Sequence, residues 1–271
     1  MTGIKEENGL ESIIFMLVAF ASVIGGFIID EGNPINLLGP APALIVIGGT
    51  IGAVCASTPI GDIKKLGSAV KMAFKKPNID LPELIGYFKQ IAFKTRKEGL
   101  LSIEEMISGD DVDPFIKKGL QMVVDGIEPQ TVKETLELSV DLIDERHKVG
   151  IGIMEMAGGY SPTLGIIGTV CSLVVVLANL GSDTSQIGKS ISSAFIATLY
   201  GISCANLIYF PIANKLKRYN NIEMQEKNLI IEAILCIQEG INPNTLDEKL
   251  KGFLDKKELE RYESMSGKEG E

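Results

Sequence analysis

Four long apolar runs without a single charged residue constrain this chain more than any other feature of its sequence. They cover residues 12–29, 37–58, 163–180 and 191–213. Each has roughly the 17 to 25 residues that a helix needs to cross a hydrocarbon core of about 30 Å. Buried helices of a soluble protein are the alternative, but the crowding of charged residues into the other segments favours a membrane protein. We therefore expect an all-α polytopic membrane protein with four transmembrane helices.

The positions of lysine and arginine predict the orientation. Most of these bases lie in residues 60–149 or after residue 214, whereas the link at 30–36 has none and the link at 181–190 has only Lys189. The positive-inside rule then places the central segment and both termini in the cytoplasm. The predicted segments are transmembrane helices 1 and 2, a cytoplasmic helical domain, transmembrane helices 3 and 4, and a cytoplasmic helical extension with a disordered tail: 1–59, 60–149, 150–213 and 214–271.

Local signals predict helices throughout the cytoplasmic segments. Three predicted starts combine an acidic residue with an early proline: Asp80–Pro82, Asp113–Pro114 and Glu128–Pro129. Ser102 and Glu105 predict a further capping box. The third start is expected to open one long rod that enters the third apolar run, and the fourth run is expected to continue as a rod toward Gly240. The last ten residues, YESMSGKEGE, are polar and lack an apolar stripe, which predicts disorder.

The third and fourth apolar runs carry small and hydroxyl side chains at helical spacing. Proton-moving proteins usually carry a charged or histidine side chain at membrane depth, but these four runs contain no Asp, Glu, Lys, Arg or His. Gly165, Thr169 and Ser172 share one face of the third run, and small residues recur every fourth position over 193–205. One interpretation is simple helix packing, with hydroxyls bonded to the preceding turn. The other is that both faces surround a partner helix that supplies the charge, while Thr169 and Thr198 offer neutral oxygens to water or to sodium.

Two prolines lie near the predicted cytoplasmic ends of the last two runs. Pro162 precedes the third run and Pro211 lies near the end of the fourth. Proline removes a backbone donor and strains the turn before it. A pair at similar depth is a candidate hinge between the spans and the cytoplasmic rods, and two tolerated kinks are the alternative.

Nothing in the sequence predicts an enzyme. The four cysteines are far apart and form no C-x-x-C pair, so we expect no cofactor, disulfide or metal centre beyond transient sodium at the two threonines. The net charge of −9 also argues against a nucleic-acid partner.

Three stretches of the chain resemble the MotA/TolQ/ExbB proton channel family: RKEGLLSIEE (96–105), GGYSPTLGIIGTV (158–170) and AFIATLYGISCANLIYFPIANK (194–215). The resemblance covers essentially the full length. ExbB and TolQ have three spans with the large cytoplasmic segment after the first, whereas here that segment follows the second of four, which favours the flagellar stator branch. An ExbB/TolQ-like energiser of envelope transport and a membrane scaffold without an ion path are the alternatives.

The resemblance implies a flagellar stator subunit in the bacterial cytoplasmic membrane, surrounded by lipid and arranged as a ring of five copies around two copies of MotB. MotB then supplies the ion-binding aspartate and the cell-wall anchor, and the cytoplasmic domains act on FliG of the rotor. Pro162 and Pro211 match the functional prolines of the family, and Thr198 matches the threonine of its fourth span. Arg96 and Glu104 match the charged pair that binds the rotor.

The resemblance also bears on the ion and on the rotor-binding pair. A threonine at position 169 beside Thr198 favours a sodium-driven stator, although threonine can also support a water chain for protons. Gly99 lies between Arg96 and Glu104. Both charges are therefore expected to flank a helix corner, where they face outward and can steer a charged partner.

Overall fold

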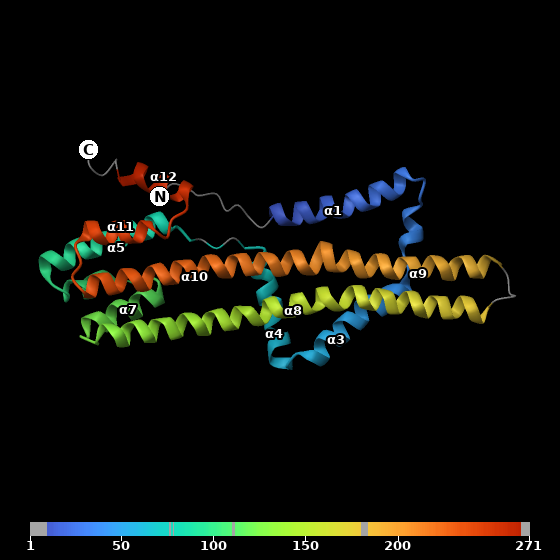
Figure 1. The fold of residues 1–271 in the computed structure, drawn as a ribbon, viewed down its shortest axis with the longest axis horizontal. Coiled ribbons are helices and arrows are strands. Elements are labelled where there is room, and N and C mark those ends of the chain that lie inside the picture. The colour runs from blue at the N-terminus through green and yellow to red at the C-terminus, as the bar shows by residue number, and fades with distance from the viewer. Residues whose placement is uncertain (1–9, 76, 78, 110–111, 180–183, 267–271) are drawn as a thin grey trace. The chain divides into compact units, whose positions relative to one another are not determined.

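The computed structural model describes residues 10–75, 77, 79–109, 112–179 and 184–266. Within these ranges every regular element is a helix and no strand occurs. The chain forms two compact units, one from Met1–Lys76 with Arg146–Tyr219 and one from Pro77–Glu145 with Asn220–Glu271. Helices α8 (Pro129–Ala178) and α10 (Phe210–Gln238) contribute residues to both units (Figure 1). The predicted all-α fold is confirmed.

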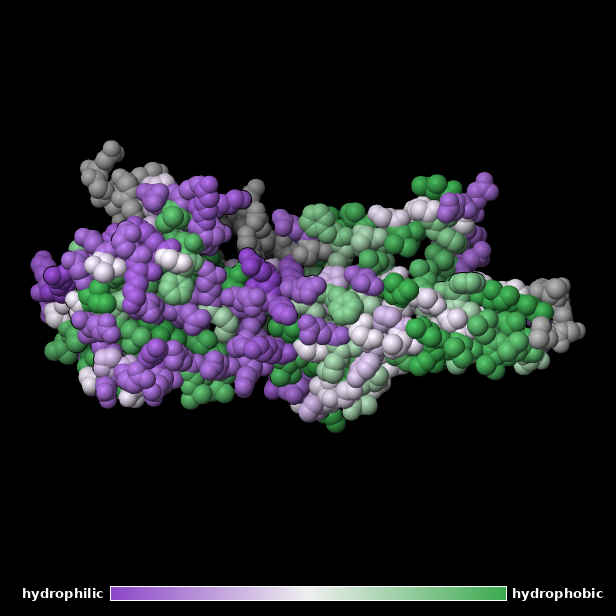
Figure 2. All heavy atoms as spheres, in the orientation of Figure 1, coloured by the Kyte–Doolittle hydropathy of each residue, from purple (hydrophilic) through white to green (hydrophobic). Residues whose placement is uncertain are grey.

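The first unit holds the apolar helices. Among the described residues, three helical stretches are long and apolar enough to cross a membrane: Pro34–Ser57, Pro129–Ala178 and Gln186–Gln238. The first apolar run forms α1 (Leu10–Ile29). The apolar part of this helix, Ile13–Ile29, is shorter than the three stretches named above. Figure 2 shows hydrophobic side chains over α8 and α9 (Thr184–Cys204) in this unit. Three of the four expected spans therefore have the length and composition of a membrane-crossing helix, and the number of crossings stays a prediction.

The second apolar run is interrupted at its start. It is built from η1 (Pro34–Leu37), α2 (Pro40–Ala43), the π-helical segment η2 (Leu44–Gly48) and α3 (Gly49–Ser57), and α4 (Ile60–Ala73) follows it. The Tyr200 hydroxyl donates to the Leu37 carbonyl at 2.6 Å and accepts from the Gly39 N–H at 3.2 Å. One side chain of α9 therefore satisfies the backbone groups at the break, which would be costly to leave unpaired in lipid.

The two predicted rods are confirmed. Helix α8 runs without interruption through Pro162. Helix α9 continues through the π-helical segment η3 (Ala205–Tyr209) into α10, which ends at Gln238 before Gly240. In η3 the Phe210 N–H donates to the Ala205 carbonyl, so a wide turn lies directly before Pro211. Because proline has no N–H to donate, the helix adjusts its hydrogen bonding at this turn.

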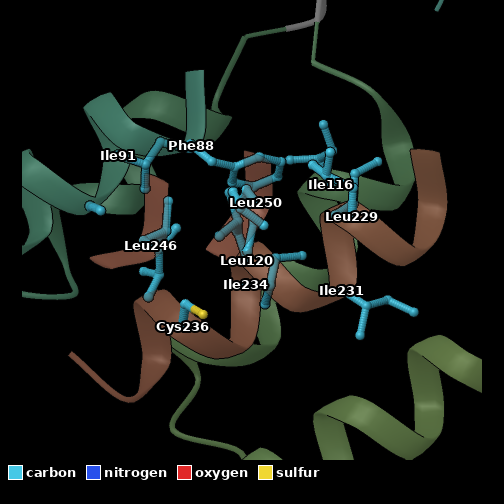
Figure 3. Packing of buried hydrophobic residues seen from close by; sticks show 14 of the residues in the cluster. Phe88, Ile91, Ile116, Leu120, Leu229, Ile231, Ile234, Cys236, Leu246 and Leu250 are labelled. Carbon is cyan, nitrogen blue, oxygen red and sulfur yellow. The ribbon is translucent and has the colours of Figure 1, made fainter. Parts of the chain in front are cut away.

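The second unit packs around one hydrophobic core. Its elements are α5 (Leu81–Glu98), α6 (Ser102–Ile107), α7 (Pro114–Val124), α11 (Pro243–Lys251), α12 (Lys256–Ser266) and the adjoining parts of α8 and α10. Phe88, Leu120, Ile234 and Leu246 are fully buried and converge from four of these helices (Figure 3). Burial of such side chains stabilises a fold by about 1.5 to 3 kcal/mol each.

Two predicted helix starts have the expected caps. The Asp80 carboxylate accepts from the Glu83 N–H at 3.2 Å, and the Asp113 carboxylate accepts from the Phe115 N–H at 2.7 Å. Each bond satisfies a first-turn amide that has no partner within its helix. The third predicted start is also correct, because α8 begins at Pro129.

The predicted capping box at Ser102 and Glu105 is wrong. Ser102 is already the first residue of α6, and its hydroxyl donates to the Gly99 carbonyl at 2.7 Å. Glu105 instead accepts from Lys94 of the preceding helix at 2.6 Å. Because α6 begins at Ser102, directly after the tight corner, Ser102 cannot act as its N-cap. Its side chain instead bonds Gly99 within the corner, and that of Glu105 bonds Lys94 across it.

The predicted disorder of the last ten residues is wrong for residues 262–266, and residues 267–271 lie outside the described range. Helix α12 includes these five residues, and the Tyr262 side chain is 3% exposed. The Tyr262 hydroxyl donates to the Asp247 carboxylate. The buried tyrosine and the ion pair of Arg261 with Asp80 thus hold a helix that has no apolar stripe.

Candidate functional site

Helices α8 and α9 approach each other closely along small residues. The Ser161 hydroxyl is buried and donates to the Gly201 carbonyl at 3.0 Å. A methyl group on Gly201 would lie 2.7 Å from the Ser161 carbonyl oxygen, and one on Gly165 would lie 2.9 Å from the Ala197 carbonyl oxygen. Backbone atoms cannot yield to such contacts, so both positions need glycine. The predicted small-residue packing of these two helices is confirmed.

The same contact brings the two candidate threonines together. The side-chain oxygens of Thr169 on α8 and Thr198 on α9 lie 2.6 Å apart. Thr169 Oγ1 also lies 2.9 Å from the Ala194 carbonyl oxygen and 3.0 Å from the Gly165 carbonyl oxygen. Two hydroxyl and two carbonyl oxygens therefore form one polar centre between two apolar helices.

Hydrogen-bond capacity decides what this centre can bind. Each hydroxyl carries one hydrogen, so Thr169 can donate to only one of its three neighbouring oxygens. Lone pairs therefore remain on the hydroxyl and carbonyl oxygens, and they can accept from water or coordinate a cation. Oxygen ligands of this neutral kind suit a hard cation. Thr169 can donate its hydrogen to the Gly165 carbonyl of the preceding turn, as in simple helix packing. The remaining lone pairs can still bind water or a cation, so the geometry is compatible with both roles.

The two prolines do not lie at the same depth, so that expectation is wrong. A methyl group on Gly201 would lie 3.2 Å from the Pro162 Cα, which places Pro162 opposite Gly201. Pro211 follows Gly201 by ten residues on the same continuous helix, roughly 15 Å along its axis. Pro162 therefore adjoins the threonine pair, whereas Pro211 adjoins the wide turn of η3.

Arg96 and Glu104 flank a helix corner in the second unit. Helix α5 ends at Glu98, Gly99 has φ +87°, and α6 begins at Ser102. Both side chains are exposed, and neither forms an ion pair with another residue in the described ranges. The corner thus separates the two charges onto different helices and leaves both available to a partner.

Sequence reasoning missed the surroundings of this corner. Lys94 and Glu105 form an ion pair that ties α5 to α6, and the hydrogen bond from Lys94 lowers the pKa of the Glu105 carboxyl while raising that of the Lys94 ammonium. Phe93 is 51% exposed and Leu101 is 72% exposed beside these charges. Their exposure could not be predicted from the sequence, because an apolar residue on a helix is expected to face the core.

Comparisons with known proteins identify the family. The family model described as the MotA/TolQ/ExbB proton channel family matches residues 109–228, and the model described as Motility protein A N-terminal matches residues 13–99. Motility protein A of Bacillus subtilis (strain 168) is 35% identical over 96% of this chain and 97% of its own length. This chain belongs to the MotA/TolQ/ExbB proton channel family.

Two further relatives agree with this family. Chemotaxis protein PomA of Vibrio alginolyticus is 34% identical over 89% of this chain and 91% of its own length. A chain of the flagellar MotAB stator complex from Bacillus subtilis has a TM-score of 0.85 and 35% identity, covering 93% of this chain and 98% of that chain. Within the MotA/TolQ/ExbB family, the match to the motility protein A N-terminal model favours the stator branch over an ExbB/TolQ-like energiser.

Proposed function

We propose that this chain is a stator subunit of the bacterial flagellar motor, forming with a MotB partner an ion channel that couples inward flow of protons or sodium to torque. The observation that carries the proposal is the threonine pair of α8 and α9, whose hydroxyls lie 2.6 Å apart in two apolar runs without Asp, Glu, Lys, Arg or His. A path of neutral oxygens can guide an ion but cannot bind and release a proton by itself. A partner helix must therefore supply the acid, and no enzymatic role is expected for this chain.

The similarity of this chain to a chain of a MotAB stator complex supports MotB as its partner. We infer a ring of five copies of this chain around two copies of MotB, in the bacterial cytoplasmic membrane. The lysines and arginines around the spans favour four crossings with both termini in the cytoplasm. In this arrangement the faces of α8 and α9 that carry Thr169 and Thr198 surround the partner helices.

Sodium is the transported ion that the oxygen set fits best. The hydroxyls of Thr169 and Thr198, with the carbonyl oxygens of Ala194 and Gly165, are neutral oxygen ligands within reach of one another. The partner carboxylate would complete the charge. Swimming that depends on sodium in the wild type supports this assignment, and unchanged motility in sodium-free medium would refute it.

Torque is proposed to pass through the prolines to the rotor-facing corner. Pro162 adjoins the threonine centre and Pro211 adjoins the wide turn of η3, so a rearrangement at the ion path can bend α8 and α10 at these points. Arg96 and Glu104 are exposed on either side of Gly99. These charges would then engage FliG by electrostatic complementarity.

Co-expression with candidate partners tests the function. In cells without stators, this chain together with a MotB-like protein that has a peptidoglycan-binding domain should restore swimming, and the two proteins should copurify. Co-expression with the same partner lacking its membrane carboxylate should give the complex without swimming. Copurification only with a TonB-linked partner would instead support an envelope energiser. A ring that conducts no ions with any of these partners would support neither function.

A further inference from the structure

The short helix α4 lies across the rods of the first unit instead of continuing along them (Figure 1). A methyl group on Gly150 of α8 would lie 2.9 Å from the Cβ of Ala69, so the two helices touch at this point. One side of α4 packs in a single hydrophobic cluster with residues of both α8 and α10: Leu66, Val70, Ala73, Ile151, Ala213 and Leu216. The other side of α4 is left to the surroundings of the chain.

The proposed topology places α4 at the cytoplasmic surface of the membrane. The second apolar run ends with α3 at Ser57, and α4 begins three residues later at Ile60. Ala213, which packs against α4, is also the last residue of the fourth apolar run. Two spans therefore end at the level of this helix, as expected for an amphipathic helix that lies in the headgroup region.

The side of α4 that faces away from the rods carries lysines. Residues 60–76 contain five lysines and one acid, Asp62. Lys64 and Lys71 are seven residues apart on α4, so they share one side of the helix. Lys75 follows four residues after Lys71, just beyond the end of α4 at Ala73. All three side chains are exposed, and we call them the lysine stripe of α4.

No acid of the described residues neutralises this stripe. Asp62 pairs with Lys65 at 3.3 Å, which accounts for the one acid of the segment. Lys64, Lys71 and Lys75 form no ion pair and no side-chain hydrogen bond within the part of the chain that the structure describes. Three like charges on one exposed surface favour an anionic partner.

Exposed apolar side chains beside the stripe favour a lipid partner over water alone. Ile60 is 73% exposed at the start of α4, and Met72 is 47% exposed near its end. Helices that lie in the membrane interface combine lysines with apolar side chains that reach the acyl boundary. Acids on a neighbouring protein could pair with the lysines, but they would not explain why the stripe lies where two spans end.

We propose that the lysine stripe of α4 binds the headgroups of anionic phospholipids in the cytoplasmic leaflet. A lysine ammonium binds phosphate as a point charge, and the negative surface potential of this leaflet attracts bases that directly follow a span. Because α4 packs on both rods, bound lipid would hold their cytoplasmic ends at the membrane surface. The binding rests on the membrane orientation of the proposed function but not on ion flow, so each can fail without the other.

Lipid titration into the purified complex with its MotB-like partner tests this binding. Native mass spectrometry would measure the affinity of the complex for phosphatidylglycerol and for the zwitterionic phosphatidylethanolamine. The wild type should bind phosphatidylglycerol more tightly. Lys71→Gln should weaken phosphatidylglycerol binding about fivefold, since one base near an anionic membrane surface contributes about that factor. Replacing the whole stripe by glutamine should remove the headgroup preference, and replacing it by arginine should keep it.

A matched variant separates the stripe from net charge. Replacing Lys117, Lys256 and Lys257 by glutamine removes the same charge from exposed positions on α7 and α12. This control should bind phosphatidylglycerol as the wild type does. Equal loss of preference in the control and in the stripe variant would overturn the proposal, because net charge would then explain it.

Two other results would also overturn the proposal. An unchanged preference in the stripe variant would place lipid binding elsewhere. Loss of the assembled ring at unchanged lipid preference would assign the stripe to a neighbouring copy. If the stripe variant does not insert, Lys71→Gln still decides. Ion flux through the same wild-type complex tests the proposed function separately, because lipid binding requires no flux.

Discussion

The side-chain oxygens of Thr169 and Thr198 lie 2.6 Å apart, although the two residues belong to different helices. The contact is possible because Gly165 and Gly201 allow the helix backbones to approach. One oxygen-lined centre therefore depends on two glycines that contribute no side chain to it. The predictions below separate the chemistry of this centre from the packing that creates it.

Removing one hydroxyl should weaken ion passage while leaving the helices in place. Thr169→Val keeps the shape of the side chain but loses an oxygen within 3.0 Å of three others. A hydrogen bond of this kind contributes about 1 kcal/mol, so we expect sodium flux through the complex to fall roughly fivefold. Thr169→Ser retains the hydroxyl and should conduct nearly as well. Equal flux in Thr169→Val and the wild type would remove Thr169 from the ion path.

Filling the glycine contact should damage assembly rather than ion selectivity. Gly201→Ala would place a methyl group 2.7 Å from the Ser161 carbonyl oxygen, and overpacking of this kind costs about 1 to 3 kcal/mol. We expect a lower thermal midpoint and a lower yield of the purified complex. Gly188→Ala on the same helix meets no atom within 4 Å and serves as the control. A stable Gly201→Ala complex would show that the helices can separate without cost.

Charge reversal at the corner should impair torque without impairing assembly. Arg96 is exposed and distant from the core of its unit, so Arg96→Glu should give normal complex yield and normal ion flux but little swimming. The rate of association with the rotor should fall about tenfold or more at low salt. Lys117→Glu, an exposed reversal on α7, should swim normally. Impaired swimming in both variants would point to net charge rather than to a specific contact.

The attachment of α12 should depend on pH. Partial burial alone raises the pKa of the Asp247 carboxyl, but hydrogen bonds from Tyr262 and Lys89 outweigh it and hold the pKa below its ordinary value of 3.8. The ionised carboxylate therefore contributes stability that is complete above the unfolded pKa and lost as the pH falls through the folded pKa. The protection factors of the α12 amides against hydrogen exchange should therefore fall in this acidic range.

Two variants test this assignment. Asp247→Asn should remove the acid-dependent change in exchange, because the titrating group is gone. Tyr262→Phe keeps the buried ring but loses the hydroxyl that bonds Asp247, which should cost about 1 kcal/mol and shift the transition to higher pH. An unchanged pH profile in Asp247→Asn would assign the transition to another group.

Much of this architecture follows from local sequence signals. The two long rods, the caps at Asp80 and Asp113, and the corner at Gly99 depend on residues within one or two turns of one another. The shared face of Gly165 and Thr169 follows from helical spacing alone. Such features need no knowledge of the tertiary contacts.

Contacts between distant residues could not be predicted in this way. Helix α12 is ordered because Asp247 of α11 accepts the Tyr262 hydroxyl and Arg261 pairs with Asp80. The depth of Pro162 depends on which residue of α9 it faces. In each case the partner, rather than the local sequence, decides the outcome.

Ion flux into vesicles most directly tests the division of roles between this chain and its partner. Vesicles would hold this chain alone, this chain with the MotB-like partner, or the same complex with the partner's membrane carboxylate replaced by its amide. We predict flux only in the second preparation, because the apolar runs of this chain contain no Asp, Glu, Lys, Arg or His. Comparable flux through this chain alone would contradict the account.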